Sequence, residues 1–509
     1  MRNKGIGSWP RRRARIAAGD IALIHEGRRW TYGEVAERVD RLANRLTELG
    51  VGTGDRVAYL GPNHPGFVET MFAAMAAGAI FVPLNTRLAP GELAGLLQDA
   101  QVRVLVWADG LDPVARAVLA QVPVELRVAV GDRPAAADHT LEQLIQGGAP
   151  APVDVPVSGH DVAMIMYTSG TTGQPRGVTL THDNLTWNAF HVLIDVDVSQ
   201  EEVTLVSAPL FHTAALNQTL LPTFLKGGTN VLESAFDPRR TFTLIAEHRV
   251  TWMFGVPAMF QALATAPGWA AADLSSVRAV EAGGAPVPEE LIRTYQARGL
   301  TFMQGYGMTE AAPGVLFLRA KDSLRKVGSA GTPCFFSDVD VVDDAGRSVA
   351  VGEPGEIVVR GPNVMRGYWR NDEASQAVLT KDGWFRSGDI AVRDDEGYLR
   401  IVDRKKDMFI SGGENVYPAE VENALHEHPA VADCAVVGVP DERWGEVGRA
   451  FVVVHEGQQL DQAGMERFLS GRLARFKIPR SLVPLDSLPR SASGKLLKRA
   501  LRAGDQGST

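Results

Sequence analysis

The chain has 509 residues, of which 45% are apolar and 22% are charged, a composition typical of globular proteins. This length exceeds the usual size of one hydrophobic core, so two or more domains are expected. The 52 basic and 60 acidic residues give a formal charge of −8, and such a surface gives no reason to expect nucleic-acid binding. The two cysteines, Cys334 and Cys434, lack metal-ligand spacing, which predicts free thiols in a reducing cytoplasm.

The sequence predicts neither a secretory signal nor a transmembrane helix. Residues 11–15 are strongly basic, but no apolar segment of the length found in signal peptides follows them. The most apolar stretch, Thr70–Leu84, is interrupted by Gly78 and Pro83 and is too short to span a bilayer. The expectation is a cytoplasmic protein whose basic N-terminal cluster makes at most a peripheral membrane contact.

The first part of the chain alternates between helices and strands. Thr31 and Glu34 form a capping box, an apolar stripe follows, and Gly50 supplies a left-handed cap, so a helix is expected over residues 31–49. Further elements are expected at residues 57–60 (strand), 65–77 (helix), 79–84 (strand), 90–99 (helix) and 102–107 (strand). This alternation predicts an α/β fold with a largely parallel sheet.

The same pattern continues beyond a stretch rich in proline and alanine at residues 149–157. Strands are expected at residues 162–166, 203–208, 251–254, 277–281 and 301–304, with helices near 244, 260 and 292. From about residue 337, three strands are joined by turns rich in Asp and Gly, which indicates a smaller β-rich portion. These strands are expected at residues 339–342, 356–360 and 397–402.

A charged run, Asp403–Asp407, precedes a C-terminal segment that has its own set of elements. These are expected at residues 418–427 (helix), 431–437 (strand), 449–454 (strand) and 462–474 (helix). The segment has about 100 residues, enough for a compact α+β domain. The predicted division is therefore a large domain of residues 1–403 and a small domain of residues 404–509.

A segment rich in glycine and hydroxyl groups follows the strand expected at residues 162–166. Residues 167–178 read YTSGTTGQPRGV, with three glycines and four serine or threonine hydroxyls. Glycines let backbone N–H groups approach an anion closely, and Arg176 adds a positive charge, so the segment suits a polyphosphate. The spacing is not that of a Walker A loop, and composition alone fits a flexible surface loop equally well.

This segment closely resembles the phosphate loop of the adenylate-forming enzymes, a superfamily that includes acyl-CoA synthetases, peptide-synthetase adenylation domains and beetle luciferases. Five further motifs resemble those of the superfamily and occur in its order. They are residues 209–213 (PLFHT), 305–310 (GYGMTE), 383–389 (GWFRSGD), 403–407 with 411–418 (DRKKD and SGGENVYP), and 489–495 (PRSASGK). The resemblance implies a large N-terminal domain of sheets flanked by helices with a β-rich subdomain, and a small, mobile α+β C-terminal domain.

The resemblance places the chain in the acyl-CoA synthetase branch and implies an ATP-dependent acyl-CoA ligase. Such an enzyme first converts a carboxylate and ATP to an acyl-adenylate and pyrophosphate, and then transfers the acyl group to the thiol of coenzyme A. Negative charge builds up on the phosphorus oxygens and on the leaving group, so catalysis depends on positioning and on cations. The implied partners are ATP, Mg²⁺, coenzyme A and a small carboxylic acid.

The same resemblance gives roles to single residues. Glu310, assisted by Thr309, is expected to hold Mg²⁺, because this cation prefers oxygen ligands. Lys495 is expected to reach between the carboxylate and the α-phosphate. Asp389 is expected to bind the ribose hydroxyls, with Arg404 supporting it. The residues expected to contact ATP or AMP are Thr168, Ser169, Gly170, Thr171, Thr172, Gly173, Arg176, Gly283, Gly284, Ala285, Gln304, Gly305, Tyr306, Gly307, Asp389 and Arg404.

The acyl group is expected to lie in a pocket with several small residues. The implied lining is Phe211, His212, Thr213, Ala214, Gly305 and Met308. His212 is also a candidate catalytic residue at a gate-like position, although a single histidine is more often structural. Small and apolar residues leave room for a medium- or long-chain fatty acid, which is the preferred interpretation, with an aryl or specialised carboxylate as the alternative.

The second half-reaction is expected to need a rotation of the small domain. Lys406 matches the pivot of the family, since a hinge residue must absorb a large change in backbone angles. After rotation, a loop that contains Ser411, Gly412, Gly413 and Glu414 would line the tunnel for the pantetheine arm of coenzyme A. Transfer to a carrier protein or to another nucleophile stays open as an alternative.

Each assigned role has a plainer alternative. Glu310 could begin a helix, Asp389 could cap a turn, and Lys495 could be one more cation in a basic tail. A nucleotide-binding protein without turnover is also conceivable, but it would not need these three residues and Arg404 together. One position departs from the family, because Arg176 stands where a lysine is usual; the two cations are not interchangeable, yet we expect activity to survive.

Overall fold

The structure is a computed structural model, and it describes residues 2–132, 136–169, 175–285, 287–411, 414–441, 443–470, 472–490 and 496–503. Two compact units make up the chain: Met1–Val339 with Val359–Phe385, and Asp340–Val358 with Arg386–Thr509. The boundary predicted between residues 403 and 404 falls inside the second unit, so the division into domains 1–403 and 404–509 stays a prediction.

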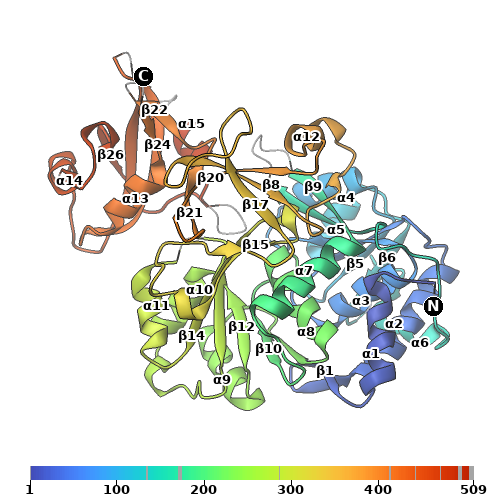
Figure 1. Cartoon of the computed structure of the whole chain (residues 1–509). Coiled ribbons are helices and arrows are strands. Elements are labelled where there is room, and N and C mark those ends of the chain that lie inside the picture. The colour runs from blue at the N-terminus through green and yellow to red at the C-terminus, as the bar shows by residue number, and fades with distance from the viewer. Residues whose placement is uncertain are drawn as a thin grey trace. The chain divides into compact units, whose positions relative to one another are not determined.

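The first unit contains an eight-stranded sheet that is mostly parallel (Figure 1). Its spatial order is β19 (Gly367–Tyr368), β9 (Pro175–Thr181), β8 (Val162–Ser169), β4 (Ile80–Leu84), β3 (Arg56–Leu60), β5 (Val104–Trp107), β6 (Leu126–Ala129) and β7 (His139–Thr140). The six strands from β8 to β7 run parallel, whereas β9 pairs antiparallel with β8 and with β19. The predicted alternation of strands and helices is confirmed here.

Helices cover both faces of this sheet because each carries an apolar stripe. The helix predicted from the capping box of Thr31 and Glu34 is present, and the box forms as expected. One face packs against α2 (Tyr32–Glu48), α3 (Pro65–Ala76) and α6 (Leu141–Gly147), and the other against α4 (Pro90–Ala100) and α5 (Asp112–Leu119). Buried on both sides, the strands are nearly continuous apolar runs.

A nine-stranded sheet forms the rest of the first unit's core. Its spatial order is β16 (Thr332–Pro333), β15 (Gly314–Leu318), β14 (Thr301–Gly307), β13 (Ala279–Gly283), β12 (Trp252–Gly255), β10 (Val203–Val206), β11 (Thr229–Leu232), β1 (Ile21–His25) and β2 (Arg28–Thr31). The strands from β14 to β1 are parallel, and antiparallel strands close both ends.

Different helices cover the two faces of the nine-stranded sheet. One face packs against α9 (Pro238–His248), α10 (Pro257–Thr265) and α11 (Glu289–Gln296). Trp252, Met303 and Phe317 on the other face contact α7 (His182–Asp195). Two further elements, the π-helix η2 (Ala214–Leu220) and α8 (Leu221–Lys226), bury residues in the core shared by both sheets.

The second unit contains most of an antiparallel sheet and all of a mixed sheet. The four strands of the first are β17 (Asp338–Val342), β18 (Pro354–Arg360), β20 (Phe385–Arg393) and β21 (Leu399–Arg404), the β-rich portion that the sequence predicts. The second sheet contains β22 (Phe409–Ser411), β23 (Glu414–Val416), β24 (Val431–Asp441), β25 (Gly445–Val454) and β26 (Ser481–Pro484), which pairs parallel with β25. It packs against α13 (Pro418–His426) and α14 (Gln462–Leu469), and α15 (Lys498–Ala503) follows later in the chain.

Several predicted elements have different bounds in the structure, for example the strand expected at residues 397–402, which is Leu399–Arg404. The helix expected over residues 462–474 ends at Leu469, where serine and glycine, both poor helix formers, follow. The strand expected at residues 277–281 starts and ends two residues later, at Ala279–Gly283. Arg278, which precedes the strand, forms an ion pair with Glu202, 2.6 Å away.

Both cysteines are buried and unpaired, as predicted. Among the helices in the described ranges, none has the length and apolar character that crossing a bilayer requires.

Asn63, which is 1% exposed, connects the end of strand β10 to the start of the predicted acyl segment. Its Nδ2 atom lies 3.0 Å from the carbonyl oxygens of Val206, Ala208 and Glu233, and its Oδ1 accepts from the N–H of Leu210 at 2.8 Å. One side chain thereby contacts four buried backbone groups, of which the Val206 carbonyl also accepts from the N–H of Glu233.

We expect Asn63→Ala to lower the free energy of unfolding by roughly 2–4 kcal/mol, because several buried backbone groups lose their partner at once. Urea unfolding followed by fluorescence measures this loss. The control is Gln121→Ala, because this exposed residue follows α5 and its amide donates to the Ala117 carbonyl at the surface of that helix. Similar midpoints for the two variants would contradict the role of Asn63.

Candidate active site

The predicted phosphate loop joins two paired strands. Strands β8 and β9 are antiparallel, with Thr168 opposite Arg176 and Ser169 opposite Pro175. The hydroxyl of Thr168 lies 3.5 Å from the carbonyl oxygen of Arg176. The four intervening predicted residues, Gly170, Thr171, Thr172 and Gly173, lie outside the described residues. The structure therefore brings the two flanks of the loop together.

Tyr368 connects two residues that the sequence assigns to the phosphates and to Mg²⁺. Strand β19 pairs with β9, which places Tyr368 opposite Val178. The guanidinium carbon of Arg176 lies 5.3 Å from the centroid of the Tyr368 ring, a cation–π distance. The Tyr368 hydroxyl donates to Oε1 of Glu310 at 3.0 Å. Burial, and then Glu310, raises the pKa of Tyr368, so the hydroxyl stays protonated and donates.

Glu310 is half-buried in a short 3-10 turn, Thr309–Ala311, directly after β14. Its backbone carbonyl accepts from the N–H of Met365, and Asn363 donates to the next carbonyl, that of Ala311. Within the part of the chain that the structure describes, no cluster of three or more His, Cys, Asp or Glu residues could hold a metal. Mg²⁺ is commonly bound through one or two carboxylates together with substrate phosphates, and Glu310 fits that mode.

The predicted adenine residues lie where two parallel strands end. Gly283 of β13 is opposite Gly305 of β14, and a Cβ on Gly283 would lie 2.9 Å from the Gly305 carbonyl oxygen. Gly284 has φ +82°, a backbone conformation that favours glycine. Gln304 is buried, and its Nε2 has no hydrogen-bond partner among the described residues. Exposed Ala285 follows β13, and Tyr306 and Gly307 end β14. In open α/β sheets, ligands bind at this edge.

The predicted acyl residues precede and begin the π-helix η2. The rings of Phe211 and His212 are T-shaped with centroids 4.7 Å apart, and His212 is half-buried. The Thr213 hydroxyl accepts from Asn217 at 3.0 Å. Helices of this rare type occur frequently at functional sites.

A small apolar cluster lies beside these residues. Its members are Ala208, Ala214, Ala215, Phe236, Phe254 and Met259. A Cβ on Gly283 would lie 3.1 Å from the Phe254 ring, so the cluster adjoins the end of β13. The structure thus brings Ala214 close to the adenine segment, whereas Met308 packs against the core shared by the two sheets.

In the second unit, Asp389 and Arg404 form an ion pair. They are opposite each other on β20 and β21, and Nε of Arg404 lies 2.8 Å from Oδ1 of Asp389. Asp389 is 4% exposed, whereas the arginine side chain is half-exposed. This pairing is the arrangement that the resemblance implies for a carboxylate supported by an arginine.

The predicted hinge is held by polar contacts within the second unit. Lys405 donates to Asp344 at 2.6 Å and to Glu356 at 3.4 Å, and Arg502 lies 3.4 Å from Asp407. The Lys406 side chain is exposed. Ser411 is buried at the end of β22, and the backbone of Glu414 begins β23. Three predicted residues, Gly412, Gly413 and Lys495, lie outside the described residues.

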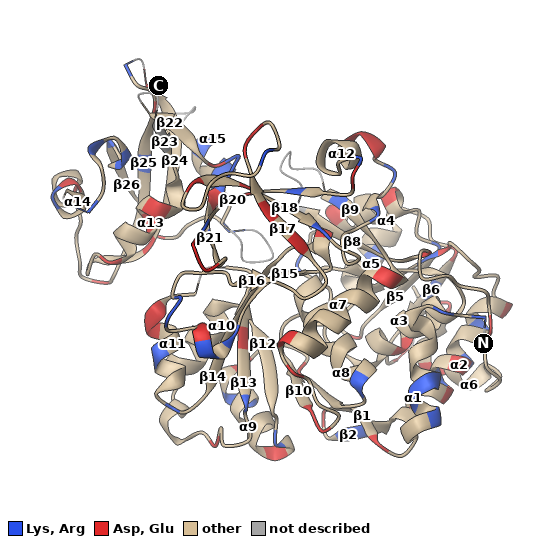
Figure 2. Cartoon of the chain, viewed as in Figure 1, with Lys and Arg blue, Asp and Glu red and all other residues tan. Residues whose placement is uncertain are grey.

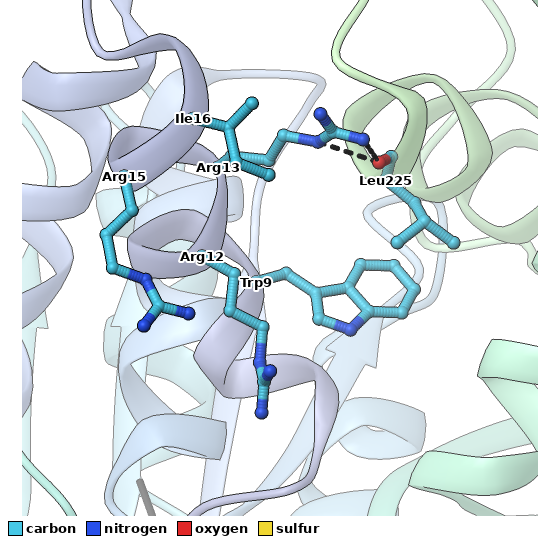
Figure 3. Close-up of a pocket in the computed structure, with 6 residues that line it drawn as sticks. All are labelled: Trp9, Arg12, Arg13, Arg15, Ile16 and Leu225. Carbon is cyan, nitrogen blue, oxygen red and sulfur yellow. Dashed lines mark hydrogen bonds between the residues drawn. The ribbon is translucent and has the colours of Figure 1, made fainter.

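A hollow of about 550 Å³ lies elsewhere in the first unit and contains none of the predicted site residues (Figure 3). It is lined by Trp9, Arg12, Arg13, Arg15, Ile16 and Leu225. Figure 3 shows Arg13 reaching the Leu225 carbonyl, to which its Nε donates at 2.7 Å. The other arginines of α1 (Trp9–Ala17) form a blue group in Figure 2. This is the basic cluster that the sequence shows near the N-terminus.

Comparisons with known proteins agree with the motifs. Residues 10–369 match the sequence profile of the AMP-binding enzyme family, and residues 420–495 match that of the AMP-binding enzyme C-terminal domain. The chain belongs to the AMP-binding enzyme family. It is an AMP-forming acyl-CoA ligase of the adenylate-forming superfamily, as the motifs predict.

Named members of the family are similar over nearly their whole length. A feruloyl-CoA synthase of Amycolatopsis sp. is 52% identical over 99% of both chains, and a long-chain-fatty-acid–CoA ligase of Mycobacterium tuberculosis is 39% identical over 98% of both. The o-succinylbenzoate CoA synthetase of Bacillus subtilis, solved with its acyl-adenylate, has a TM-score of 0.87 and 32% identity over 97% of this chain and 98% of its own. The same synthetase has been solved with ATP and magnesium, with a TM-score of 0.86 and 99% of its chain covered.

Sequence reasoning missed Tyr368, since nothing local marks it. Its place beside Glu310 results from the pairing of β19 with β9, strands separated by more than a third of the chain. Glu281, discussed below, did carry a signal: it is an acidic residue in a predicted buried strand, where charged side chains are rare.

We expect Tyr368→Phe to raise the Mg²⁺ concentration needed for half-maximal adenylation and to slow adenylation about tenfold, because Glu310 loses its hydrogen bond. Pyrophosphate exchange at graded Mg²⁺ measures both effects. Tyr59→Phe is the matched control, since the buried Tyr59 hydroxyl has no hydrogen-bond partner among the described residues. If both variants behave as the parent enzyme does, Tyr368 does not position Glu310.

Proposed function

We propose that this acyl-CoA ligase activates an aromatic carboxylic acid of the arylpropenoate type in the cytoplasm. The observation that carries the proposal is the 52% identity to a feruloyl-CoA synthase over 99% of both chains, well above the 39% to a fatty-acid ligase. The named substrate of that relative is a flat ring joined to a short carboxylate-bearing arm. Buried, unpaired cysteines are compatible with a reducing compartment.

The composition of the proposed acyl pocket supports a ring more than a long chain. Three alanines with Phe254 and Met259 offer an apolar slot, and aromatic rings stack favourably on an aromatic side chain. Glu281 lies buried beside Gly305, and the buried Gln218 donates a hydrogen bond to it. An alkyl chain packed there would leave polar atoms without partners, whereas an aromatic ring can carry oxygen substituents that satisfy them.

In the first half-reaction, a carboxylate oxygen of the acid attacks the α-phosphorus of ATP. The new C–O–P linkage forms while the bond to the β-phosphate oxygen breaks, and pyrophosphate leaves. We assign Arg176 and the phosphate loop to the β- and γ-phosphates, and Asp389 with Arg404 to the ribose. Mg²⁺ neutralises charge on the phosphates when bound, and Glu310 with Thr309 would hold it.

Lys495 is proposed to stabilise the negative charge that develops at the α-phosphate. In the second half-reaction, the sulfur of coenzyme A attacks the acyl carbonyl carbon, AMP leaves, and the thiol proton passes to solvent. Ser411, Gly412, Gly413 and Glu414 are proposed to line the approach of the pantetheine arm. His212 is proposed as a wall of the acyl pocket.

A medium- or long-chain fatty acid is the second candidate substrate, favoured by the identity to the mycobacterial ligase. Delivery to a carrier protein in place of free coenzyme A is the second candidate for the acceptor. The first alternative changes the acid that is bound and the second changes the acceptor of the acyl group, but both keep the adenylation step.

Products identified by mass spectrometry test the proposal. The enzyme is incubated with ATP and Mg²⁺, with and without coenzyme A, and with cinnamic, hydroxycinnamic, benzoic and C8–C18 alkanoic acids. We expect acyl-CoA from the cinnamic series at kcat/KM values at least tenfold above those for any alkanoic acid. Higher kcat/KM values for alkanoic acids would contradict the proposal and indicate a fatty acid as the substrate. Adenylate that accumulates in the presence of coenzyme A would point to another acceptor.

The two half-reactions should separate in a pair of variants. Lys495→Ala should reduce adenylation by a factor of roughly 100 or more while transfer from a supplied acyl-adenylate continues, because only the first step builds charge at the α-phosphate. Lys406→Pro should have the opposite effect, since a fixed φ restricts the proposed pivot. Pyrophosphate exchange and single-turnover thioester formation measure the two steps. Equal losses of both steps in either variant would contradict its assigned role.

A further inference from the structure

Glu281 is a buried carboxyl group that the reaction described so far does not use. It lies in the middle of β13, is 1% exposed, and accepts a hydrogen bond at Oε1 from Nε2 of Gln218 at 2.9 Å. Its other oxygen, Oε2, is buried and has no hydrogen-bond partner among the described residues. A buried polar atom without a partner is costly, so its retention calls for a reason.

The position of Glu281 places this carboxyl at the proposed acyl site. In the parallel register, Phe254 of β12 is directly opposite Glu281, and Gly283 is opposite Gly305. Because side chains alternate between faces, Glu281 and these two glycines share one face of the sheet. A Cβ on Gly305 would lie only 2.6 Å from Oε1 of Glu281. Because residue 305 is a glycine, no side chain separates Oε1 of Glu281 from the backbone of Gly305, a residue expected to contact the acyl group.

The elements packed against this face contribute few other titratable groups. Asp195 on α7 and Cys334 after β16 interact electrostatically with Glu281, and Gln218 is the neutral partner on η2. Burial raises the pKa of Glu281 to about 8, opposed by the hydrogen bond from Gln218 and assisted by Asp195. The group is therefore protonated at neutral pH, and its Oε2 can carry a proton to donate.

We propose that Glu281 determines substrate specificity by hydrogen bonding, through its carboxyl group, to a hydroxyl group on the ring of the aromatic acid. The inference rests on the proposed function and deepens it by naming a ring-hydroxylated acid as the preferred substrate. A phenolic hydroxyl both donates and accepts, so it pairs with a carboxyl group in either protonation state. Gln218 holds the carboxyl in place from the π-helix, and Phe254 lies beside it for stacking.

A site built around a hydroxyl partner rejects the analogue that lacks the hydroxyl, because the buried group of the protein then stays unpaired. An apolar pocket would discriminate weakly between the same two acids. The comparison of 4-hydroxycinnamic acid with cinnamic acid therefore isolates the contribution of Glu281. Both acids have the same ring, arm and carboxylate, and so they make the same demands on ATP and coenzyme A.

The experiment measures kcat and KM of the full-length enzyme, Glu281→Leu, Glu281→Gln and the control Glu233→Gln with both acids. Glu233 is a buried carboxyl outside the proposed site, hydrogen bonded to Thr241. We expect the parent enzyme to favour 4-hydroxycinnamic acid at least tenfold in kcat/KM. Glu281→Leu should remove this preference, mainly through KM, with the value for cinnamic acid unchanged or raised. Glu281→Gln, which still offers a hydrogen bond, should retain part of the preference, and Glu233→Gln all of it.

The outcomes separate the inference from the function on which it rests. If Glu281→Leu lowers kcat/KM equally for both acids, Glu281 is a structural residue, and the aromatic-acid function stands without this specificity. The same conclusion holds if the parent enzyme does not distinguish the two acids. If the parent enzyme acts on alkanoic acids and on neither aromatic acid, the proposed function fails and the inference fails with it. Thermal unfolding and ATP binding of each variant show whether the fold is intact.

Discussion

The parallel pairing of β13 with β14 is the constraint on which the candidate active site depends. Its register places Gly283 opposite Gly305, and the contact between them leaves no room for a side chain at residue 283. The same register aligns the ends of both strands, so that Gly284 and the turn with Glu310 leave the sheet at the same edge. A one-residue slip would move Glu281 to the opposite face, among the apolar residues that pack against α10 and α11. The backbone hydrogen bonds between β13 and β14 therefore position both the candidate site residues and the apolar side chains on the opposite face.

Much of this arrangement could be predicted from the sequence, because it follows from local chemistry. The capping box at Thr31, the alternation of apolar strands with helices, and the punctuation by glycine each act over a few residues, and the structure follows them. The ordered motifs predicted the family and its reaction, since their residue types are those that phosphate, ribose and metal binding require. The contact between Asp389 and Arg404 could also be predicted, because both residues lie within motifs.

The remaining features depend on pairing between distant segments, which no local pattern encodes. Tyr368 reaches Glu310 only because β19 joins the edge of the sheet beside β9. Asn63 lies far in sequence from the backbone groups of residues 206–210 and of Glu233 that it satisfies. The substrate preference was also out of reach, because small residues such as Ala214 and Gly305 describe an empty volume without saying what fills it. The fatty-acid interpretation drawn from them considered the volume of these residues and not the buried polar side chains of Glu281 and Gln218.

That polarity gives the strongest argument about the substrate. Among the described residues, Gln218 is the one hydrogen-bond partner of the buried Glu281 carboxyl, and such a carboxyl destabilises the folded enzyme relative to an apolar residue of similar size. The π-helix that carries Gln218 departs from regular helical geometry, and such departures concentrate at functional sites. Gly305, the neighbour of the carboxyl, adds no side chain that would shield it from a bound molecule. The buried carboxyl, the π-helix and the glycine at position 305 therefore lie together at the proposed acyl site. A polar substituent on the substrate accounts for all three together, because it would pair with the carboxyl group in the space that Gly305 leaves free beside Oε1.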